Sequence, residues 1–266
     1  MRRILSSGLR AINAVLRPLN LRLQHSPAPT RSFGEFCSHL KAHGLEIRTV
    51  IDVGVGSGTP ALYDAFPDAA FVLVEPVVEN RPALDALSSR LRARVALAAA
   101  GAVNGQVTIH VHDDLTGSSV LRQAEGTMAD GASRRVPLVR LDSLLPVPPV
   151  RPCLVKLDTQ GTELDVIEGL GERLADVDVF IIETSLMPFR SGAPEFAEVV
   201  GRLHVLGFVV YDILEGHMRA LDRALAQVDL AMVRAYSPLR RDSRFFSDAQ
   251  FASYQKYWRA RRGSVS

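Results

Sequence analysis

Short apolar runs alternate with amphipathic stretches along most of this 266-residue chain. The runs have the length of buried strands, and most of the stretches between them have the length of short helices. Alternation of this kind predicts a mostly parallel, doubly wound α/β sheet. The predicted strands cover residues 49–54, 70–75, 94–99, 106–111, 136–141, 153–158 and 178–183, and the predicted helices cover residues 59–66, 79–91, 162–170 and 194–206.

The end of this pattern lacks a helix between two strands. Apolar runs at residues 208–213 and 228–233 follow one another directly. They predict an antiparallel hairpin that closes the sheet. Such a hairpin is the addition that distinguishes methyltransferase sheets from dinucleotide-binding ones.

A glycine-rich turn follows the first predicted strand. Gly54, Gly56 and Gly58 alternate with other residues, and Asp52 stands two positions before the first glycine. Glycines tolerate positive φ angles, so backbone N–H groups can close on a ligand there. The spacing differs from the Gly-x-Gly-x-x-Gly turn that holds a pyrophosphate, and a carboxylate beside that anion would repel it. The same carboxylate would attract the sulfonium and ammonium groups of S-adenosylmethionine, which is therefore the predicted cofactor of this turn and of Asp52.

Acidic residues end further predicted strands. Glu75 lies 21 residues after Gly54 and is well placed to hold the two hydroxyls of a ribose. Asp158 and Glu183 end two later strands, and ligands of such sheets bind at the carboxyl ends of the strands. Each of these acids, taken alone, could simply cap a helix. Together with Asp52 they make four acids at one edge of the sheet, which favours a functional site.

The segment Lys156-Leu-Asp158-Thr-Gln160-Gly161-Thr-Glu163 resembles the Lys-x-Asp-x-x-Gly-x-Glu signature of the FkbM family of S-adenosylmethionine-dependent methyltransferases. One departure is Val55-Gly56, where family members commonly have Ala-Asn, which puts a detail of cofactor contact in doubt. The resemblance covers about residues 48–235. Its other pieces follow in the family's order: Asp52-Val-Gly54, Glu75-Pro76, Gly117-Ser118-Ser119, Arg140-Leu-Asp142, Glu183-Thr-Ser and Gln227-Val-Asp229.

This resemblance implies a class I methyltransferase fold, a Rossmann-like, doubly wound and mostly parallel sheet with a terminal antiparallel hairpin. It also implies O-methylation of a hydroxyl on a sugar, a glycan or another natural product. The matching pieces place Pro76, Ser118 and Ser119 beside the cofactor, together with the glycines and Glu75.

Methyl transfer to a hydroxyl requires a nearby group that accepts its proton. Asp158 is the candidate base or orienting residue, and Glu183 is a further candidate. Lys156 faces the same side of its strand as Asp158, because side chains alternate along a strand. Two interpretations of Lys156 stay open, one in which it keeps Asp158 ionised and one in which it forms a structural salt bridge. Asp158 and Glu183 could instead share Mg²⁺, which would lower the pKa of the hydroxyl.

Charge divides the chain into three parts. Residues 1–31 contain six arginines and no acid, and eight basic residues face two acids from Arg234 onward, so the net charge of +2 conceals an acidic middle. We expect a basic, amphipathic N-terminal helical extension over residues 1–47, a methyltransferase domain over residues 48–235 and a basic aromatic C-terminal tail over residues 236–266. The extension either packs on the domain, which we favour, or lies on an anionic membrane. The tail is expected to be docked or frayed, without binding nucleic acid.

Cysteine use and hydropathy bear on location. Cys37 and Cys153 lie far apart without metal-ligand spacing, which favours a reducing compartment and argues against a zinc site. No run reaches the roughly 18 apolar residues of a membrane span, and a secretory signal is not expected. We therefore expect a cytoplasmic enzyme with a small-molecule or glycan acceptor, whose oligomeric state the sequence leaves open.

Two other functions are alternatives to methyl transfer for this sequence. An NAD(P)-dependent Rossmann oxidoreductase would need Gly-x-Gly-x-x-Gly and a hydride-site pair such as Tyr-x-x-x-Lys, and the chain has neither. A catalytically inactive methyltransferase-fold binding module is opposed by the strand-end acids, although Val55-Gly56 leaves it open.

Overall fold

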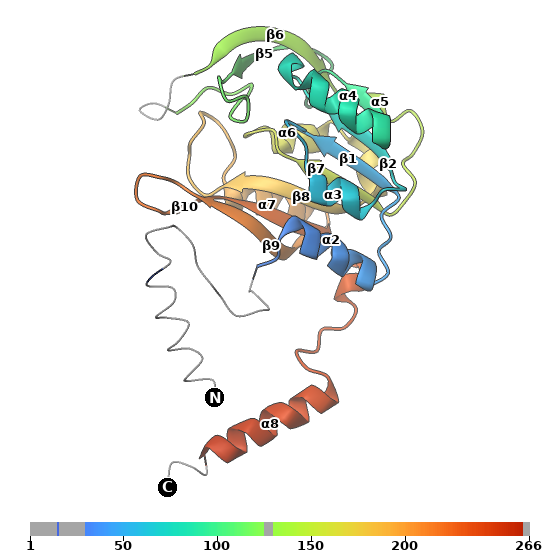
Figure 1. Cartoon of the computed structure of the whole chain (residues 1–266), viewed down its shortest axis with the longest axis vertical. Coiled ribbons are helices and arrows are strands. Elements are labelled where there is room, and N and C mark those ends of the chain that lie inside the picture. The colour runs from blue at the N-terminus through green and yellow to red at the C-terminus, as the bar shows by residue number, and fades with distance from the viewer. Residues whose placement is uncertain (1–14, 16–29, 125–129, 263–266) are drawn as a thin grey trace.

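The computed structural model describes residues 15, 30–124 and 130–262 (Figure 1). Most of the basic, amphipathic extension expected over residues 1–47 therefore lies outside the described residues. Within the described part, no helix is both long and apolar enough to cross a membrane.

A seven-stranded sheet forms the centre of the molecule, in the order β3-β2-β1-β7-β8-β10-β9. Neighbouring strands from β3 to β8 pair in parallel, whereas β10 pairs antiparallel to both β8 and β9. This order confirms the doubly wound sheet and its closing antiparallel hairpin, and with them the class I methyltransferase fold. The strands are β1 Thr49–Val53, β2 Ala70–Val74, β3 Arg92–Ala96, β7 Cys153–Leu157, β8 Val177–Ser185, β9 Phe208–Met218 and β10 Leu225–Arg234.

Helices cover both faces of this sheet (Figure 1). One face packs against α2 (Phe33–Ala42), α3 (Pro60–Ala65) and α4 (Arg81–Arg90), and the other against α5 (Leu141–Leu144), α6 (Glu163–Glu168) and α7 (Phe196–Val205). The central strands are consequently buried on both sides, which explains why they are continuous apolar runs rather than alternating ones.

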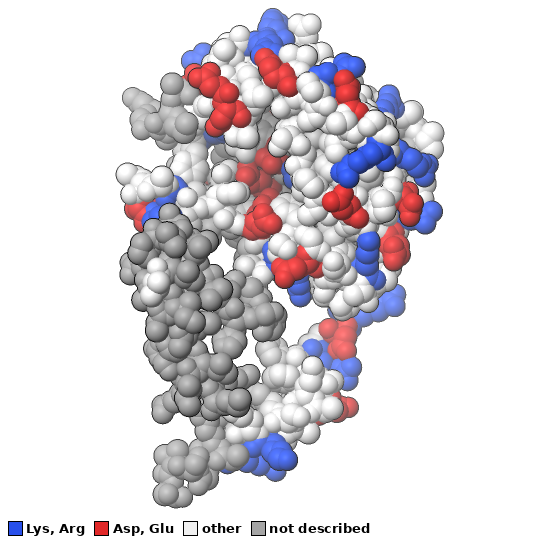
Figure 2. All heavy atoms as spheres, in the orientation of Figure 1, with Lys and Arg blue, Asp and Glu red and all other residues white. Residues whose placement is uncertain are grey.

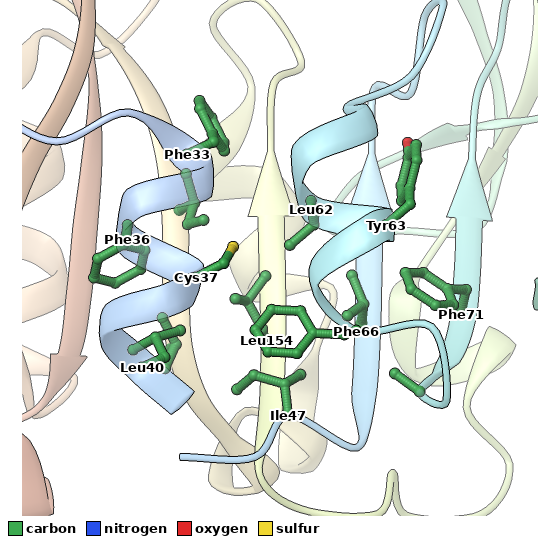
Figure 3. Close-up of a cluster of buried hydrophobic side chains, with 14 of the residues drawn as sticks. Phe33, Phe36, Cys37, Leu40, Ile47, Leu62, Tyr63, Phe66, Phe71 and Leu154 are labelled. Atoms are coloured by element: carbon green, nitrogen blue, oxygen red, sulfur yellow. The ribbon is translucent and has the colours of Figure 1, made fainter. Parts of the chain in front are cut away.

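The first of these faces is closed by α2 and α3, which lie next to each other (Figure 3). Phe36, Cys37 and Leu40 of α2 meet Leu62 of α3 above Leu154 of β7, and all five are fully buried. A capping box between Ser32 and Glu35 starts α2. The segment before β1 is thus part of the domain's core and covers one face of the sheet.

A second, three-stranded sheet was not predicted. It consists of β4 (Ala99–Ala100), β6 (Ala132–Val139) and β5 (Gly105–Val111), in that order. The strand predicted at residues 94–99 is split, because β3 is the edge of the main sheet and the chain then turns to pair with β6. The strand predicted at residues 136–141 ends earlier, since α5 already begins at Leu141.

The C-terminal segment also differs from the expectation of a docked or frayed tail. It forms α8, which runs from Asp248 to Arg262 and projects away from the domain (Figure 1). The side chains of residues 248–259 are exposed.

The close approach of the glycine turn to β7 generates a prediction about stability. Gly54 has φ +77°, and a Cβ atom there would lie 1.8 Å from the carbonyl oxygen of Asp158. Gly44 has almost the same φ, +78°, with nothing within 4 Å of a Cβ. We expect Gly44→Ala to lower the free energy of unfolding by about 1 kcal/mol, the cost of a left-handed residue, and Gly54→Ala to lower it by at least about 3 kcal/mol.

Denaturant unfolding of both variants measures the difference. Equal losses of stability would show that β1 and β7 can separate at this end of the sheet and that the close contact is unimportant.

Candidate active site

The carboxyl ends of β1, β2, β7 and β8 open into a cavity of about 430 Å³. The glycine turn after β1, the segment Glu75–Val77 after β2 and the loop around Ser119 form much of its wall. Figure 2 shows acidic side chains gathered in the hollow at the centre of this face. The cavity therefore lies where open α/β sheets bind their ligands.

Glu75 fixes the shape of the glycine turn. Its Oε2 atom accepts a hydrogen bond from the N–H of Gly56 at 2.8 Å, and its Oε1 atom accepts one from the N–H of Val77 at 2.8 Å. Burial raises the pKa of this carboxyl, while the two backbone donors act in the opposite direction. A carboxylate has about four acceptor positions, so Glu75 keeps capacity for a ligand's hydroxyl groups.

Asp52 does not line the cavity, although it was predicted to contact the cofactor directly. Its side chain is fully buried, and its Oδ2 atom accepts a hydrogen bond from the Tyr63 hydroxyl at 2.5 Å. The physical reason is that Asp52 lies within β1, beneath α3, rather than beyond the end of the strand. The structure thus places Asp52 behind the cavity wall, as a buried partner of Lys156, which does line the cavity, and its contact with the cofactor stays a prediction.

Lys156 is the link between Asp52 and the cavity. Its Nζ atom lies 3.7 Å from Asp52 Oδ1 and 3.2 Å from Asp158 Oδ2. Burial alone would lower the pKa of this lysine, but the nearby carboxylates of Asp158 and Asp52 outweigh burial and raise it. Lys156 is therefore charged and stabilises negative charge on both neighbours.

Asp158 and Glu183 are joined by the side chain of Gln160. The Nε2 atom of Gln160 donates to Asp158 Oδ1 at 3.0 Å and to Glu183 Oε2 at 2.6 Å. Gln227 donates to the same oxygen of Glu183 at 2.9 Å. The predicted candidates Asp158 and Glu183 are thus brought together, by two amides that were not predicted as site residues.

The acids of this cluster outnumber its cation. Asp52, Asp158, Glu183 and Asp229 surround Lys156. Burial and the neighbouring carboxylates of Asp158 and Asp229 raise the pKa of Glu183 to about 9. Burial and Asp158 raise the pKa of Asp229 to about 6. Without a further positive charge, the cluster holds a proton at neutral pH.

A second cavity of about 920 Å³ adjoins the first. Both cavities are lined by Asp158, Gln160, Glu183 and His217, so the acids stand where the two spaces meet. Phe189 and Arg190, which follow β8, line the second cavity. Two ligands, one in each cavity, would therefore meet at the same carboxylates.

Ten predicted site residues line the first cavity, and only Asp52 among the predicted residues does not. Ser119 is nearly inaccessible, and its hydroxyl donates to the carbonyl oxygen of Gln160. The ten predicted residues that line the first cavity are Gly54, Gly56, Gly58, Glu75, Pro76, Ser118, Ser119, Lys156, Asp158 and Glu183.

Asp229 was not predicted as a site residue, although an acid within an apolar strand was a signal.

The arrangement gives no support to the Mg²⁺ site considered for Asp158 and Glu183. A divalent cation needs several oxygen ligands that converge on it. Here the N–H groups of Gln160 point at both carboxylates. Among the described residues, no group of three His, Cys, Asp or Glu side chains could hold a metal ion.

One family of known proteins matches more than half of the chain. The model of the methyltransferase FkbM domain family matches residues 52–210. No curated protein matches the chain.

Two solved structures illustrate the likeness. The 1,6-didemethyltoxoflavin-N1-methyltransferase of Burkholderia thailandensis is 13% identical with a TM-score of 0.42, over 88% of this chain and 86% of that one. An rRNA methylase of Streptococcus thermophilus is 10% identical with a TM-score of 0.41, over 79% of this chain and 99% of that one.

The pKa of Glu183 generates a prediction about stability and pH. The carboxyl has a pKa of about 9 in the folded protein against 4.5 ordinarily, so between these values only the folded state keeps the proton. Its contribution to stability is therefore complete below the lower value and is lost as the pH rises toward the higher one. Glu183→Gln, which cannot ionise, should raise the thermal midpoint of the ligand-free protein by a few degrees at pH 8 and by much less at pH 5.

Thermal unfolding at the two pH values tests this, with Glu172→Gln on the exposed surface as the control for the substitution itself. A midpoint difference between Glu183→Gln and wild type that is the same at pH 5 and pH 8 would contradict the assignment of the proton.

Proposed function

This chain belongs to the FkbM methyltransferase family, and we propose that it transfers the methyl group of S-adenosylmethionine to a hydroxyl oxygen of a sugar, a glycan or another natural product. The observation that supports this proposal is the meeting of two cavities at Asp158 and Glu183. In it, the first cavity takes the cofactor and the second takes the acceptor.

The residues of the first cavity fit a cationic nucleoside cofactor. The turn at Gly54 approaches the carbonyl oxygen of Asp158 too closely for a side chain, and its backbone lines the cavity. Glu75 stands at the end of β2, where an acid can hold ribose hydroxyls. The excess of carboxylates around Lys156 favours a ligand that carries positive charge. When bound, the cofactor supplies an electrophilic methyl group.

Asp158 is the proposed general base. It reaches both cavities, and Lys156 and Gln160 each direct a donor at its carboxylate, which stabilises its negative charge. Glu183 carries a proton in the ligand-free protein, so it is poorly suited to accept another. In the proposed reaction, Asp158 takes up the proton of the acceptor hydroxyl while Glu183 orients the acceptor.

The acceptor is proposed to be a small molecule or a glycan because the second cavity is a concave space lined by polar side chains. Carboxylates, amides and imidazoles there can hydrogen-bond several hydroxyl groups at once. Both cysteines are buried free thiols, which supports a reducing, cytoplasmic location. Contact of the N-terminal extension with a membrane stays a proposal from its sequence alone.

Cofactor choice generates the first functional prediction. S-adenosylmethionine should bind saturably in isothermal titration calorimetry, and NAD should not. Glu75→Ala should weaken that binding at least about tenfold, because both the ribose contact and the anchoring of Gly56 are lost. Glu79→Ala is the matched control, since Glu79 is exposed and pairs with Arg134 outside the cavity. Unchanged affinity in Glu75→Ala would refute its role.

The second functional prediction concerns the role of Asp158. An acceptor is first identified by measuring transfer of a labelled methyl group to a panel of glycans and natural-product alcohols. With that acceptor, Asp158→Asn should lower kcat at least about 100-fold, the usual contribution of a general base. The Kd for S-adenosylmethionine should stay within about threefold, as the amide keeps the shape of the side chain.

Asp165→Asn, on the exposed side of α6, is the control for Asp158→Asn and should retain full turnover. Retention of turnover in Asp158→Asn itself would remove Asp158 from the role of base.

A further inference from the structure

We propose that Gln160 is a positioning residue whose side-chain amide holds Asp158 and Glu183 together at the junction of the two cavities and couples them to the wall of the acceptor cavity. This inference rests on the proposed function, because it concerns the geometry of the proposed base. The contacts of the amide, its orientation and the backbone of Gln160 each support it.

The amide uses both of its N–H groups on the two acids. The Nε2 atom lies 3.0 Å from Asp158 Oδ1 and 2.6 Å from Glu183 Oε2. Among the described residues, Gln160 is the one side chain that donates to both carboxylates. Two acids this close repel each other when charged, so a shared donor fixes their separation without adding charge.

The other end of the amide is held by Arg190. The Nη2 atom of Arg190 donates to Gln160 Oε1 at 3.1 Å and to the carbonyl oxygen of Gly117 at 2.8 Å. Because a guanidinium can only donate, it occupies the oxygen end and directs the nitrogen end at the acids. Arg190 and Gly117 both line the second cavity. The wall of that cavity is thus joined through one amide to the proposed base.

The backbone of Gln160 gives no reason for a glutamine. Its φ is +58°, in the left-handed region where a glycine is comfortable and a residue with a Cβ is strained. The surroundings impose this conformation, since Ser119 donates to the carbonyl oxygen of Gln160 and Glu163 accepts from the N–H groups of Thr159 and Gly161. Strain that is held in place at a site of this kind indicates a functional side chain.

Replacement of Gln160 by glycine separates positioning from folding. In Gln160→Gly the backbone strain is relieved and the amide is lost. We expect kcat to fall about 10- to 100-fold, the cost of a displaced catalytic group, with the KM and Kd for S-adenosylmethionine within about threefold of wild type. The thermal midpoint should stay within about 3 °C, because relief of strain offsets the lost hydrogen bonds.

The split between kcat and cofactor binding gives a readout that a purely structural role would not produce. A general loss of structure would weaken cofactor binding together with turnover, whereas a displaced base lowers kcat and leaves the KM and Kd for S-adenosylmethionine in place. The charged groups around the pair stay in place in this variant: Lys156 on β7, Glu163 in α6, Asp229 on β10, His217 on β9 and Arg190 after β8.

Two matched variants complete the experiment. Arg223 also has a positive φ, +66°, and lines neither cavity. Arg223→Gly therefore relieves a comparable strain and should leave kcat unchanged. Gln227→Ala removes a donor from Glu183 but none from Asp158, so its loss of kcat should be several times smaller than that of Gln160→Gly.

Three outcomes would overturn the inference: wild-type kcat in Gln160→Gly, equal losses in Gln160→Gly and Gln227→Ala, or a fall in thermal midpoint beyond about 3 °C with a parallel loss of cofactor binding. Failure of the proposed function has a different signature, because the wild-type protein itself would then transfer no methyl group to any hydroxyl acceptor in the panel.

Discussion

The ammonium group of Lys156 is the interaction on which the rest of the site depends. It is buried between Asp52 and Asp158, which come from the adjacent parallel strands β1 and β7. Removal of one partner from a buried ion pair is far more costly than the pair is stabilising. Burial raises the pKa of Asp52 beneath α3, while Lys156 and the Tyr63 hydroxyl act in the opposite direction. A group outside the cavity thereby contributes to the orientation of the carboxylate inside it.

The order of the strands explains why so many acids share one edge. β1 lies in the middle of the sheet between β2 and β7, so the chain leaves it in one direction and returns on its other side. At such a switch point the loops diverge and leave a crevice at the carboxyl ends of the strands. Glu75 and Asp158 directly follow β2 and β7, and Glu183 lies two residues before the end of β8, so all three stand around this crevice. The antiparallel strand β10 then adds Asp229 from the opposite direction.

Much of this could be predicted from the sequence, because strand positions and strand-end acids depend on local patterns. The alternation of side chains along β7 correctly places Lys156 beside Asp158. The burial of a side chain cannot be predicted in the same way, since it depends on which helix covers the strand. Asp52 is buried because α3 covers β1 at this position. The contacts of Gln160 depend on Arg190 and Glu183, which come from distant parts of the chain, so no local pattern reports them. The second sheet likewise arises from long-range pairing between β4, β5 and β6.

The imbalance between carboxylates and ammonium has a consequence for turnover. In the proposed reaction, the methyl group would leave a sulfonium that carries one positive charge, and the acceptor hydroxyl would release one proton. The cluster around Lys156 has room for one added positive charge, so it could accommodate the bound cofactor and the released proton in turn. On this proposal the spent cofactor, a neutral thioether at its sulfur atom, would lose that attraction. The charge of the cluster would then favour exchange of spent cofactor for fresh cofactor.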